Sequence, residues 1–300
     1  MINPKTALLV LNPVSGVKSS VIVRDRFETV FQNAGWSIEV HITAPKESLA
    51  EIIRQSISNG ISLVVAAGGD GTVSEVASAL VGTGIPLGII PAGTGNALAH
   101  NLGIPLALED ALKLLIGPNH RILLDALAFP HRYYLLNVGV GLSASLIKST
   151  PREHKRRFGY LAYVWHLLAQ ASGLRLRRYR LNIDGKQYRI WASELMVVNS
   201  SIIGLGELKA FSEINADDGK VEVLAIRAPT IFGLARIALR FMLGYRQKGP
   251  GYITYTAAKS ITIHSRKSEV VQADGEIIGR TPIEIHVCPA AVEIIIPPRQ

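Results

Sequence analysis

Residues 63–72 read Leu-Val-Val-Ala-Ala-Gly-Gly-Asp-Gly-Thr. The apolar run predicts a buried strand, Leu63–Ala67, and the three glycines after it would let the backbone take positive φ and approach a ligand closely. A helix is expected at Val73–Leu80, and the free N–H groups and the dipole at its start suit a phosphate. Asp70 would repel phosphate oxygens. A carboxylate in this turn therefore indicates a residue that binds a metal ion or accepts a hydroxyl proton. The alternative is a plain strand-to-helix loop with a solvated aspartate.

Around this stretch, the first part of the chain alternates short apolar strands with helical patterns. This alternation predicts a parallel sheet covered by helices on both faces, with ligands at the carboxyl ends of its strands. The expected strands are Ala7–Leu11, Ser37–Ile42, Leu63–Ala67 and Leu87–Ile90, and the expected helices are Ser20–Ala34, Ser48–Asn59, Val73–Leu80 and Glu109–Ile116.

After about residue 121 the pattern changes to strands separated by Asp-Gly turns, with two helices among them. This pattern predicts a second, mainly antiparallel β domain. We therefore expect an α/β domain at 1–122 and a β-rich domain at 123–300. The expected strands are Tyr133–Val138, Tyr179–Ile183, Leu195–Asn199, Val221–Ile226, Ser260–His264, Val270–Gln272 and Ile283–Val287, and the helices are Phe158–Ala171 and Ile231–Leu243.

Three loops rich in glycine and polar residues follow three of the expected parallel strands. Because such strands end at one edge of a sheet, the N–H groups, hydroxyls and amides of these loops could converge on one polyphosphate. The sequence contains no G-x-x-x-x-G-K-[ST] loop, so an ordinary P-loop enzyme is excluded. The three loops are Asn12-Pro-Val-Ser-Gly16, Gly68-Gly-Asp-Gly-Thr72 and Pro91-Ala-Gly-Thr-Gly-Asn96.

Two further glycine motifs lie later in the chain. Residues 139–144 match the dinucleotide fingerprint G-x-G-x-x-A, but no βαβ unit follows them, and we interpret them as a strand-to-helix turn. Asp274-Gly275-Glu276 follows a short strand, and its two carboxylates could hold magnesium or accept a proton. Asp-Gly is also a common hairpin signal, so a plain turn is the alternative.

The composition favours a globular protein of one large or two medium domains. The 300 residues are 48% hydrophobic and 18% charged. The single cysteine, Cys288, allows no intramolecular disulfide, and the N-terminal Met-Ile-Asn-Pro-Lys has no signal-peptide pattern. We expect a cytoplasmic protein without a transmembrane segment, since the longest candidate, Phe158–Leu174, is short and interrupted by polar residues.

The net charge of +9 is unevenly spread along the chain. Between Pro151 and Arg180 lie eight arginines and lysines and one acidic residue. Such a stretch attracts an anionic membrane, nucleic acid or a phosphorylated ligand, or it is simply a solvated charged face. The apolar helix Phe158–Ala171 is flanked by basic clusters, and Ile231–Leu243 carries Arg236 and Arg240 among apolar residues. Both patterns predict interfacial helices or core helices with a basic outer face.

In their order along the chain, the three loops and Asp274-Gly-Glu276 resemble the diacylglycerol kinase catalytic-domain family. The match is closest to its bacterial lipid kinases, which are related to sphingosine kinases. The resemblance implies an NAD-kinase-like three-layer α/β domain that binds ATP and a β-sandwich domain that binds lipid. It implies transfer of the γ-phosphoryl group to a lipid hydroxyl, with diacylglycerol as the expected acceptor and a sphingosine-like lipid as the alternative.

The resemblance also implies roles for individual residues. Glu276 would accept the proton, with Asp274 and Asp70 supporting magnesium and the lipid hydroxyl. A structural Mg²⁺ site would use Asn215, Asp218 and the Lys220 carbonyl, with a solvated turn as the alternative. ATP contacts are implied for Asn12, Ser15, Gly16, Thr43, Gly68, Gly69, Asp70, Gly71, Thr72, Val73, Ser74, Glu75, Thr94, Gly95 and Asn96.

Two positions depart from the family's pattern. Ala97 and Ser143 stand where many relatives carry acidic residues, which leaves the identity of the lipid open. An NAD or sugar-phosphate kinase, or a nucleotide-binding protein with weakened activity, are the rival interpretations. The expected partner is a lipid substrate at an anionic membrane surface, to which the protein binds peripherally, and a homodimer is possible. Nucleic acid is not expected, because base-stacking loops are missing among the basic residues.

Overall fold

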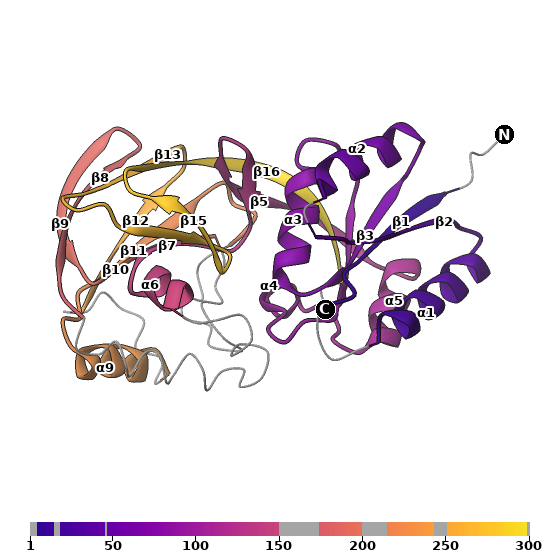
Figure 1. The fold of residues 1–300 in the computed structure, drawn as a ribbon, viewed down its shortest axis with the longest axis horizontal. Helices are drawn as coiled ribbons and strands as arrows, with labels where there is room; N and C mark the ends of the chain where they lie inside the picture. Colours follow the sequence, from indigo (N-terminus) through magenta and orange to yellow (C-terminus); the bar gives the residue numbers. More distant parts are fainter. Residues whose placement is uncertain are drawn as a thin grey trace. The chain divides into compact units, whose positions relative to one another are not determined.

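The computed structural model describes residues 5–14, 19–45, 47–149, 174–199, 215–242 and 251–298. The chain divides into unit 1, Met1–Leu124 with Ala290–Gln300, and unit 2, Asp125–Pro289 (Figure 1). The expected boundary near residue 122 lies close to this division, but residues 290–300 belong to unit 1 and not to the second domain. The reason is strand β16 (Ile283–Ile296), whose last part pairs in parallel with β4 (Leu87–Pro91) through Ile294 and Leu87.

Unit 1 is the expected parallel α/β domain. Its strands follow the order β2-β1-β3-β4-β16, and β3 and β4 are buried along their whole length. Helices α2 and α3 pack together on one face of the sheet, and α1 and α5 on the other (Figure 1). The remaining elements are β1 (Thr6–Leu11), β2 (Ser37–Ile42), β3 (Leu63–Gly68), α1 (Ser20–Asn33), α2 (Leu49–Ser58), α3 (Asp70–Leu80), α4 (Ala97–Leu102) and α5 (Leu108–Ile116).

Two helices of unit 1 differ from expectation. Helix α3 begins at Asp70 and not at Val73, with Gly69 as its N-cap, so the glycine-rich turn is the first turn of the helix. An acidic side chain is favourable in a first helical turn, which accounts for the earlier start. Helix α4 was not predicted, because its six residues are too few to show a helical period.

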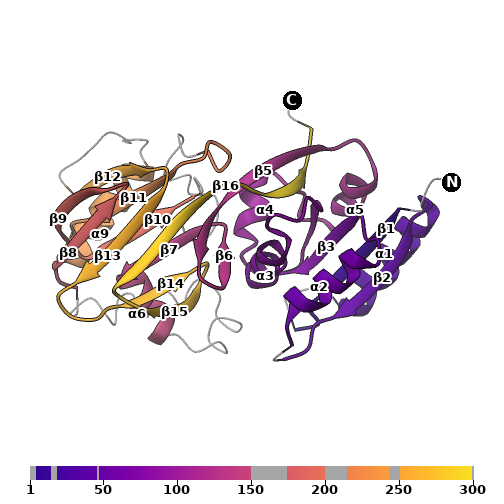
Figure 2. The same cartoon turned by 90° about the horizontal axis from the view of Figure 1, so that it is seen from above.

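Unit 2 is an antiparallel β-sandwich, as the resemblance implied (Figure 2). One layer follows β16-β13-β8-β9, with β5 pairing with β16 and β6, and the other follows β12-β11-β10-β7-β14-β15. Buried side chains from both layers, such as Tyr179, Val223 and Ile261, form one core. The strands are β5 (His120–Phe129), β6 (Arg132–Tyr134), β7 (Asn137–Gly141), β8 (Arg177–Ile183), β9 (Lys186–Ala192), β10 (Glu194–Val198), β11 (Val221–Ile226), β12 (Tyr252–Ala257), β13 (Ser260–Ser265), β14 (Val270–Ala273) and β15 (Glu276–Arg280).

Two helices of unit 2 are described. Helix α6 (Leu142–Ser149) follows β7 directly, so the G-x-G-x-x-A stretch is the expected strand-to-helix turn. Helix α9 (Ile231–Met242) packs on the outer side of the β10–β12 layer. The predicted helix Phe158–Ala171 lies outside the described residues. Within the described part of the chain, no helix combines the length and the apolar character needed to cross a bilayer.

Candidate functional site

In unit 1, the loops that follow β1, β3 and β4 lie side by side, as their positions in the sequence predict. The Asn12 N–H donates to the Ala67 carbonyl at 3.0 Å, and the Ala92 N–H donates to the Gly68 carbonyl at 2.9 Å. The Asn12 side chain also donates from Nδ2 to Thr72 Oγ1 at 2.9 Å. These bonds join the three loops into one edge of backbone and polar groups. Ser15 and Gly16 lie outside the described residues.

The glycines of this edge are required by close packing of the loops. A Cβ atom on Gly68 would lie 2.6 Å from Thr72 Cβ, and one on Gly93 would lie 2.5 Å from Gly69 Cα. We expected positive φ here, but none of these glycines has it. The absence of side chains at Gly69 and Gly93 lets two backbone segments almost touch.

Asp70 connects the starts of two helices. Its Oδ1 accepts a hydrogen bond from the Leu98 N–H at 3.4 Å, so the first turn of α3 is tied to the start of α4. Burial raises the pKa of Asp70, and the N–H groups of Leu98, Ala97 and Asn96 offset part of this rise. A half-buried carboxylate of raised proton affinity at this edge can attract a cation or accept a proton.

The loop after β4 is closed by Asn96, which has a left-handed backbone with φ 49°. Its Oδ1 accepts from the Gly93 N–H at 2.9 Å, and its Nδ2 donates to the Gly93 carbonyl at 2.8 Å. Asn96 therefore shapes the loop, while Thr94 is exposed and accessible to a ligand.

The remaining residues expected to contact ATP fall into two groups. Val73 and Ser74 are each 4% exposed, so their side chains are part of the packing of α3. Gly71 and Glu75 are exposed on the same helix. Thr43 lies at the end of β2, where its N–H donates to the Leu11 carbonyl at 2.9 Å. Contact of each of these residues with a nucleotide remains a prediction.

In unit 2, Asp274-Gly275 forms the hairpin turn between β14 and β15. Both residues have positive φ, 45° and 86°, as the tight hairpin turns favoured by Asp-Gly require. The Asp274 carboxylate accepts three backbone N–H groups, from Leu135 and Leu136 at 3.0 Å and from Asn137 at 2.9 Å. These bonds hold the connection between β6 and β7, and they break the predicted strand Tyr133–Val138 into two. These bonds hold the Asp274 carboxylate in place, and its role beside magnesium and the lipid hydroxyl remains a prediction.

Glu276 begins β15 beside this turn. Its Oε2 accepts from Arg132 Nη1 at 2.8 Å, and the two side chains are 39% and 29% exposed. The Arg132 guanidinium also lies over the Tyr134 ring, 5.1 Å from its centroid. Sequence reasoning missed Arg132, because nothing in the sequence pairs β6 with a turn more than a hundred residues later. The Glu276 carboxylate is therefore oriented and still reachable by solvent.

The buried side-chain amide of Gln272 holds the Asp274-Gly275 turn through hydrogen bonds. Gln272 is 2% exposed; its Oε1 accepts from the Gly275 N–H at 3.0 Å, and its Nε2 donates to Asn137 Oδ1 at 2.8 Å. This chain of bonds fixes Gly275, the residue between the two acidic side chains. Gln272 was also missed, although it stands only two residues before Asp274.

Near Gln272 lies a buried carboxylate, Glu194, which is 3% exposed. It accepts the Ser143 N–H at 2.9 Å and the Ser143 hydroxyl, and it thereby caps the start of α6. Burial raises the pKa of Glu194 to about 7. A Cβ on Gly139 would lie 2.6 Å from Gln272 Nε2 and 3.1 Å from Glu194 Oε1, so the two buried groups are neighbours. Ser143 is thus bonded to a carboxylate from the neighbouring strand β10.

The loop expected to hold magnesium is organised by a second carboxylate. Asp218 Oδ1 accepts from the Lys220 N–H at 2.9 Å. The buried Asp125 accepts from the Gly219 N–H at 2.6 Å, and its own N–H donates to the Ala216 carbonyl at 2.7 Å. No cluster of three or more His, Cys, Asp or Glu able to hold a metal occurs among the described residues. The set of Asn215, Asp218 and the Lys220 carbonyl contains one carboxylate and remains a prediction.

Comparisons with known proteins agree with this architecture. Residues 6–123 match the diacylglycerol kinase catalytic domain, and residues 137–296 match the YegS C-terminal NAD kinase beta sandwich-like domain. The protein named "probable lipid kinase YegS" from Shigella boydii serotype 18 is 28% identical over 277 residues, which are 90% of this chain and 89% of the relative. An uncharacterized protein of Synechocystis, sll0036, is 29% identical over 310 residues, covering 98% of this chain and 70% of the relative.

Solved structures show the same fold. A crystal structure described as a diacylglycerol kinase from Bacillus anthracis str. Sterne has a TM-score of 0.73 at 21% identity and covers 98% of this chain and 97% of its own. Another structure from the same organism has a TM-score of 0.80 at 23% identity, with 98% and 95% covered. At these identities the likeness concerns the fold.

Proposed function

Because the chain belongs to the diacylglycerol kinase catalytic domain family and carries the YegS-type C-terminal domain, we propose that it is a lipid kinase that phosphorylates diacylglycerol with ATP. The oxygen of the lipid hydroxyl bonds to the γ-phosphorus as the bond to ADP breaks, and the hydroxyl proton passes to a carboxylate. The products are phosphatidic acid and ADP. The observation that carries the proposal is the packed edge of glycine loops beside Asp70.

The nucleotide is assigned to the loops of unit 1. Transfer of a phosphoryl group depends mostly on positioning and charge neutralisation, and backbone N–H groups at a helix start provide both. The near-contact of Gly69 and Gly93 supports this assignment, because any side chain there would fill the space next to the start of α3. Thr94 and Gly71, both exposed, are the proposed contacts that face the phosphates.

The proton acceptor is assigned to Glu276. A general base has to be reachable by the hydroxyl and held in one orientation. Glu276 meets both needs, since it is 39% exposed and bonded to Arg132 at 2.8 Å. Asp274 and Gln272 are proposed to keep the Asp-Gly-Glu turn in place.

Magnesium is the proposed cofactor, and Asp70 and the loop 215–220 are its proposed ligands. Bound to ATP, magnesium would neutralise charge on the transferring phosphates. Carboxylate and carbonyl oxygens are the donors that this ion prefers, and both sites offer only such donors. Next to the 215–220 loop, the buried Asp125 supports a cation further, because it adds a carboxylate to those of Asp217 and Asp218.

A panel of acceptors with γ-labelled ATP tests the proposed substrate. Diacylglycerol, a sphingosine-type lipid and NAD are offered separately, and the labelled products are identified. We expect label in phosphatidic acid, with the Glu276→Gln variant as the matched negative control. Label in the sphingosine-type lipid alone would keep the lipid kinase and replace its acceptor. Label in NAD alone would overturn the lipid assignment.

A further inference from the structure

Helix α9 has one apolar face against the sheet and further apolar side chains on its exposed face. Its twelve residues, Ile-Phe-Gly-Leu-Ala-Arg-Ile-Ala-Leu-Arg-Phe-Met, include no acidic side chain. On the inner side, Ile237 is 8% exposed and packs, together with Leu234, on a cluster around Met196 and Tyr252. On the outer side, Phe232 is 84% exposed and Leu239 is 54% exposed. Residues seven apart lie on one face of a helix, so the two apolar side chains form one exposed stripe.

Beside this helix lies a cavity with three arginines. Arg227, Arg236 and Arg240 line it together with Gly251 and Tyr252, and its volume is about 150 Å³. None of the described residues that line it is acidic. A water molecule occupies about 30 Å³ in the liquid, so the cavity has room for a phosphate group. Most of the cavity wall is apolar, and the three arginines are its charged residues. Guanidinium groups bind phosphate oxygens through paired hydrogen bonds, so the ligand that fits these charges is an anionic phosphate.

Gly251, just before β12, allows close packing of Ile237 of α9 against the backbone there. A Cβ atom on Gly251 would lie 2.7 Å from Ile237 Cδ1, so a larger residue there would force the Ile237 side chain or α9 to shift. The cavity is therefore part of the fixed packing between the helix and the sheet.

An exposed apolar stripe next to arginines is the pattern of a helix that lies in a membrane interface. We propose that α9 docks unit 2 on a membrane, with Phe232 and Leu239 entering the interface and the Arg227–Arg236–Arg240 cavity receiving the phosphate of an anionic phospholipid headgroup. The inference rests on the proposed function, because a lipid acceptor has to be met at a membrane.

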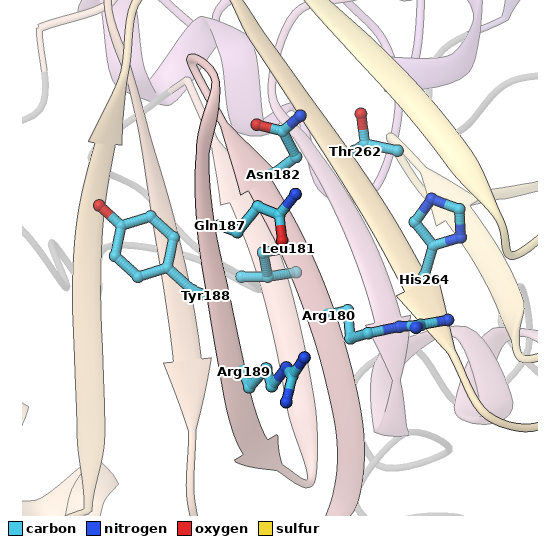
Figure 3. Close-up of a pocket in the computed structure, with 8 residues that line it drawn as sticks. All are labelled: Arg180, Leu181, Asn182, Gln187, Tyr188, Arg189, Thr262 and His264. Atoms are coloured by element: carbon cyan, nitrogen blue, oxygen red, sulfur yellow. The ribbon is translucent and has the colours of Figure 1, made fainter.

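A second basic surface on the other layer of the sandwich provides a matched control. On the outer face of β8, β9 and β13, Arg180 lies directly opposite Arg189, and His264 lies opposite Arg180. Figure 3 shows this face, where a cavity of about 700 Å³ is lined mostly by polar side chains such as Asn182 and Thr262. Among the described residues, β9 also carries an exposed aromatic side chain, Trp191, which is 53% exposed. This face has similar charge to the α9 surface and lacks the apolar helical stripe.

Sedimentation with vesicles tests the proposal. The full-length protein is mixed with vesicles of phosphatidylcholine, with or without about 30 mol % phosphatidylglycerol. We expect binding to the anionic vesicles only. Because each arginine near an anionic surface contributes about 1 kcal/mol, the double variant Arg227→Gln/Arg236→Gln should bind them about 10- to 30-fold more weakly. Phe232→Ser should weaken binding about 10-fold without changing thermal unfolding, since its ring is exposed.

The control is Arg180→Gln/Arg189→Gln, which removes the same charge from the other layer and should bind as the wild type does. Equal loss in both double variants, or equal binding of the wild type to neutral vesicles, would overturn the docking site. The docking site would also be overturned if the wild type binds no vesicles and forms a dimer that Phe232→Ser dissociates. The exposed stripe would then be the contact surface for a second copy of the protein.

Activity on a short-chain, water-soluble diacylglycerol separates this proposal from the proposed function. The Arg227→Gln/Arg236→Gln variant should keep that activity while it loses vesicle binding. If the wild type phosphorylates no lipid at all, the proposed function fails, and the vesicle experiment still decides whether α9 docks on a membrane.

Discussion

Glu276 Oε2 lies 2.8 Å from Arg132 Nη1 in an ion pair, and the proposed chemistry depends on the Glu276 carboxylate. Glu276→Gln keeps the size of the side chain and removes its ability to accept a proton. We expect kcat to fall roughly 10²- to 10⁴-fold while the KM for ATP stays near the wild-type value. Steady-state kinetics measure both. Glu284→Gln, at a 59% exposed position in the same unit, is the control. A fully active Glu276→Gln enzyme would remove Glu276 from the mechanism.

Glu194 is the buried group whose charge is expected to make stability depend on pH. Its pKa is raised by burial from 4.5 to about 7, so between these values the folded protein holds a proton that the unfolded chain has lost. The unfolded state therefore binds fewer protons, and the free energy of unfolding falls as pH rises from about 4.5 to about 7.

Urea unfolding of the wild type and of Glu194→Gln measures this contribution. The side chain of the variant does not titrate. Relative to the wild type, its free energy of unfolding should therefore rise by an amount on the order of a few kcal/mol between about pH 4.5 and about pH 7. Above about pH 7 the difference between the two proteins should stay constant. A difference that is constant with pH would show that Glu194 is ionised throughout.

At the scale of elements, the two loops that meet at Gly69 and Gly93 are expected to tolerate substitution unequally. A Cβ on Gly93 would lie 2.5 Å from Gly69 Cα, whereas one on Gly69 would lie 3.3 Å from Gly93 Cα. Gly93→Ala should therefore destabilise unit 1 by about 1–3 kcal/mol and weaken ATP binding, and Gly69→Ala should do so less. Chemical denaturation and calorimetric titration with ATP measure the two effects. Equal values for the two variants would contradict the packed arrangement of the loops.

Most elements could be predicted from the sequence where the pattern is local. The strands of unit 1 and the loops after them follow from apolar runs that end in glycine, and the structure places them within a residue or two of expectation. The break in the strand expected at Tyr133–Val138 could not be predicted. It arises because the Asp274 carboxylate binds the N–H groups of Leu135 and Leu136, and such a bond between distant residues leaves no periodic signal.

The candidate site shows the same division. Asp70, Asp274 and Glu276 stand in short motifs of glycine and acidic residues, which can be found by inspection. Arg132 and Glu194 could not be found in this way, because each contacts a partner that is distant in sequence and lies on or next to another strand. An arginine in a short strand and a glutamate before an apolar run occur in many sequences, so neither residue stands out by its sequence context.

At the scale of the whole molecule, the last residues of the chain complete unit 1. Ile294 is fully buried and pairs with Leu87, although the strand that carries it begins in unit 2. Ile294→Ala should cost about 2–5 kcal/mol in unit 1, since it leaves a cavity in the core. Ile277→Ala, at a 43% exposed position, should change stability little. Thermal unfolding with limited proteolysis separates the two units, and similar small effects from both substitutions would contradict the assignment of residues 290–300 to unit 1.

Phosphoryl transfer to lipid is tested most directly by incubation of the protein with γ-labelled ATP, magnesium and a total lipid extract. Asp70→Asn is the matched variant, because an amide oxygen can still accept the Leu98 N–H while the negative charge is lost. We predict label in phosphatidic acid with the wild type and none with Asp70→Asn. An extract without labelled lipid, or equal labelling by Asp70→Asn, would contradict the account.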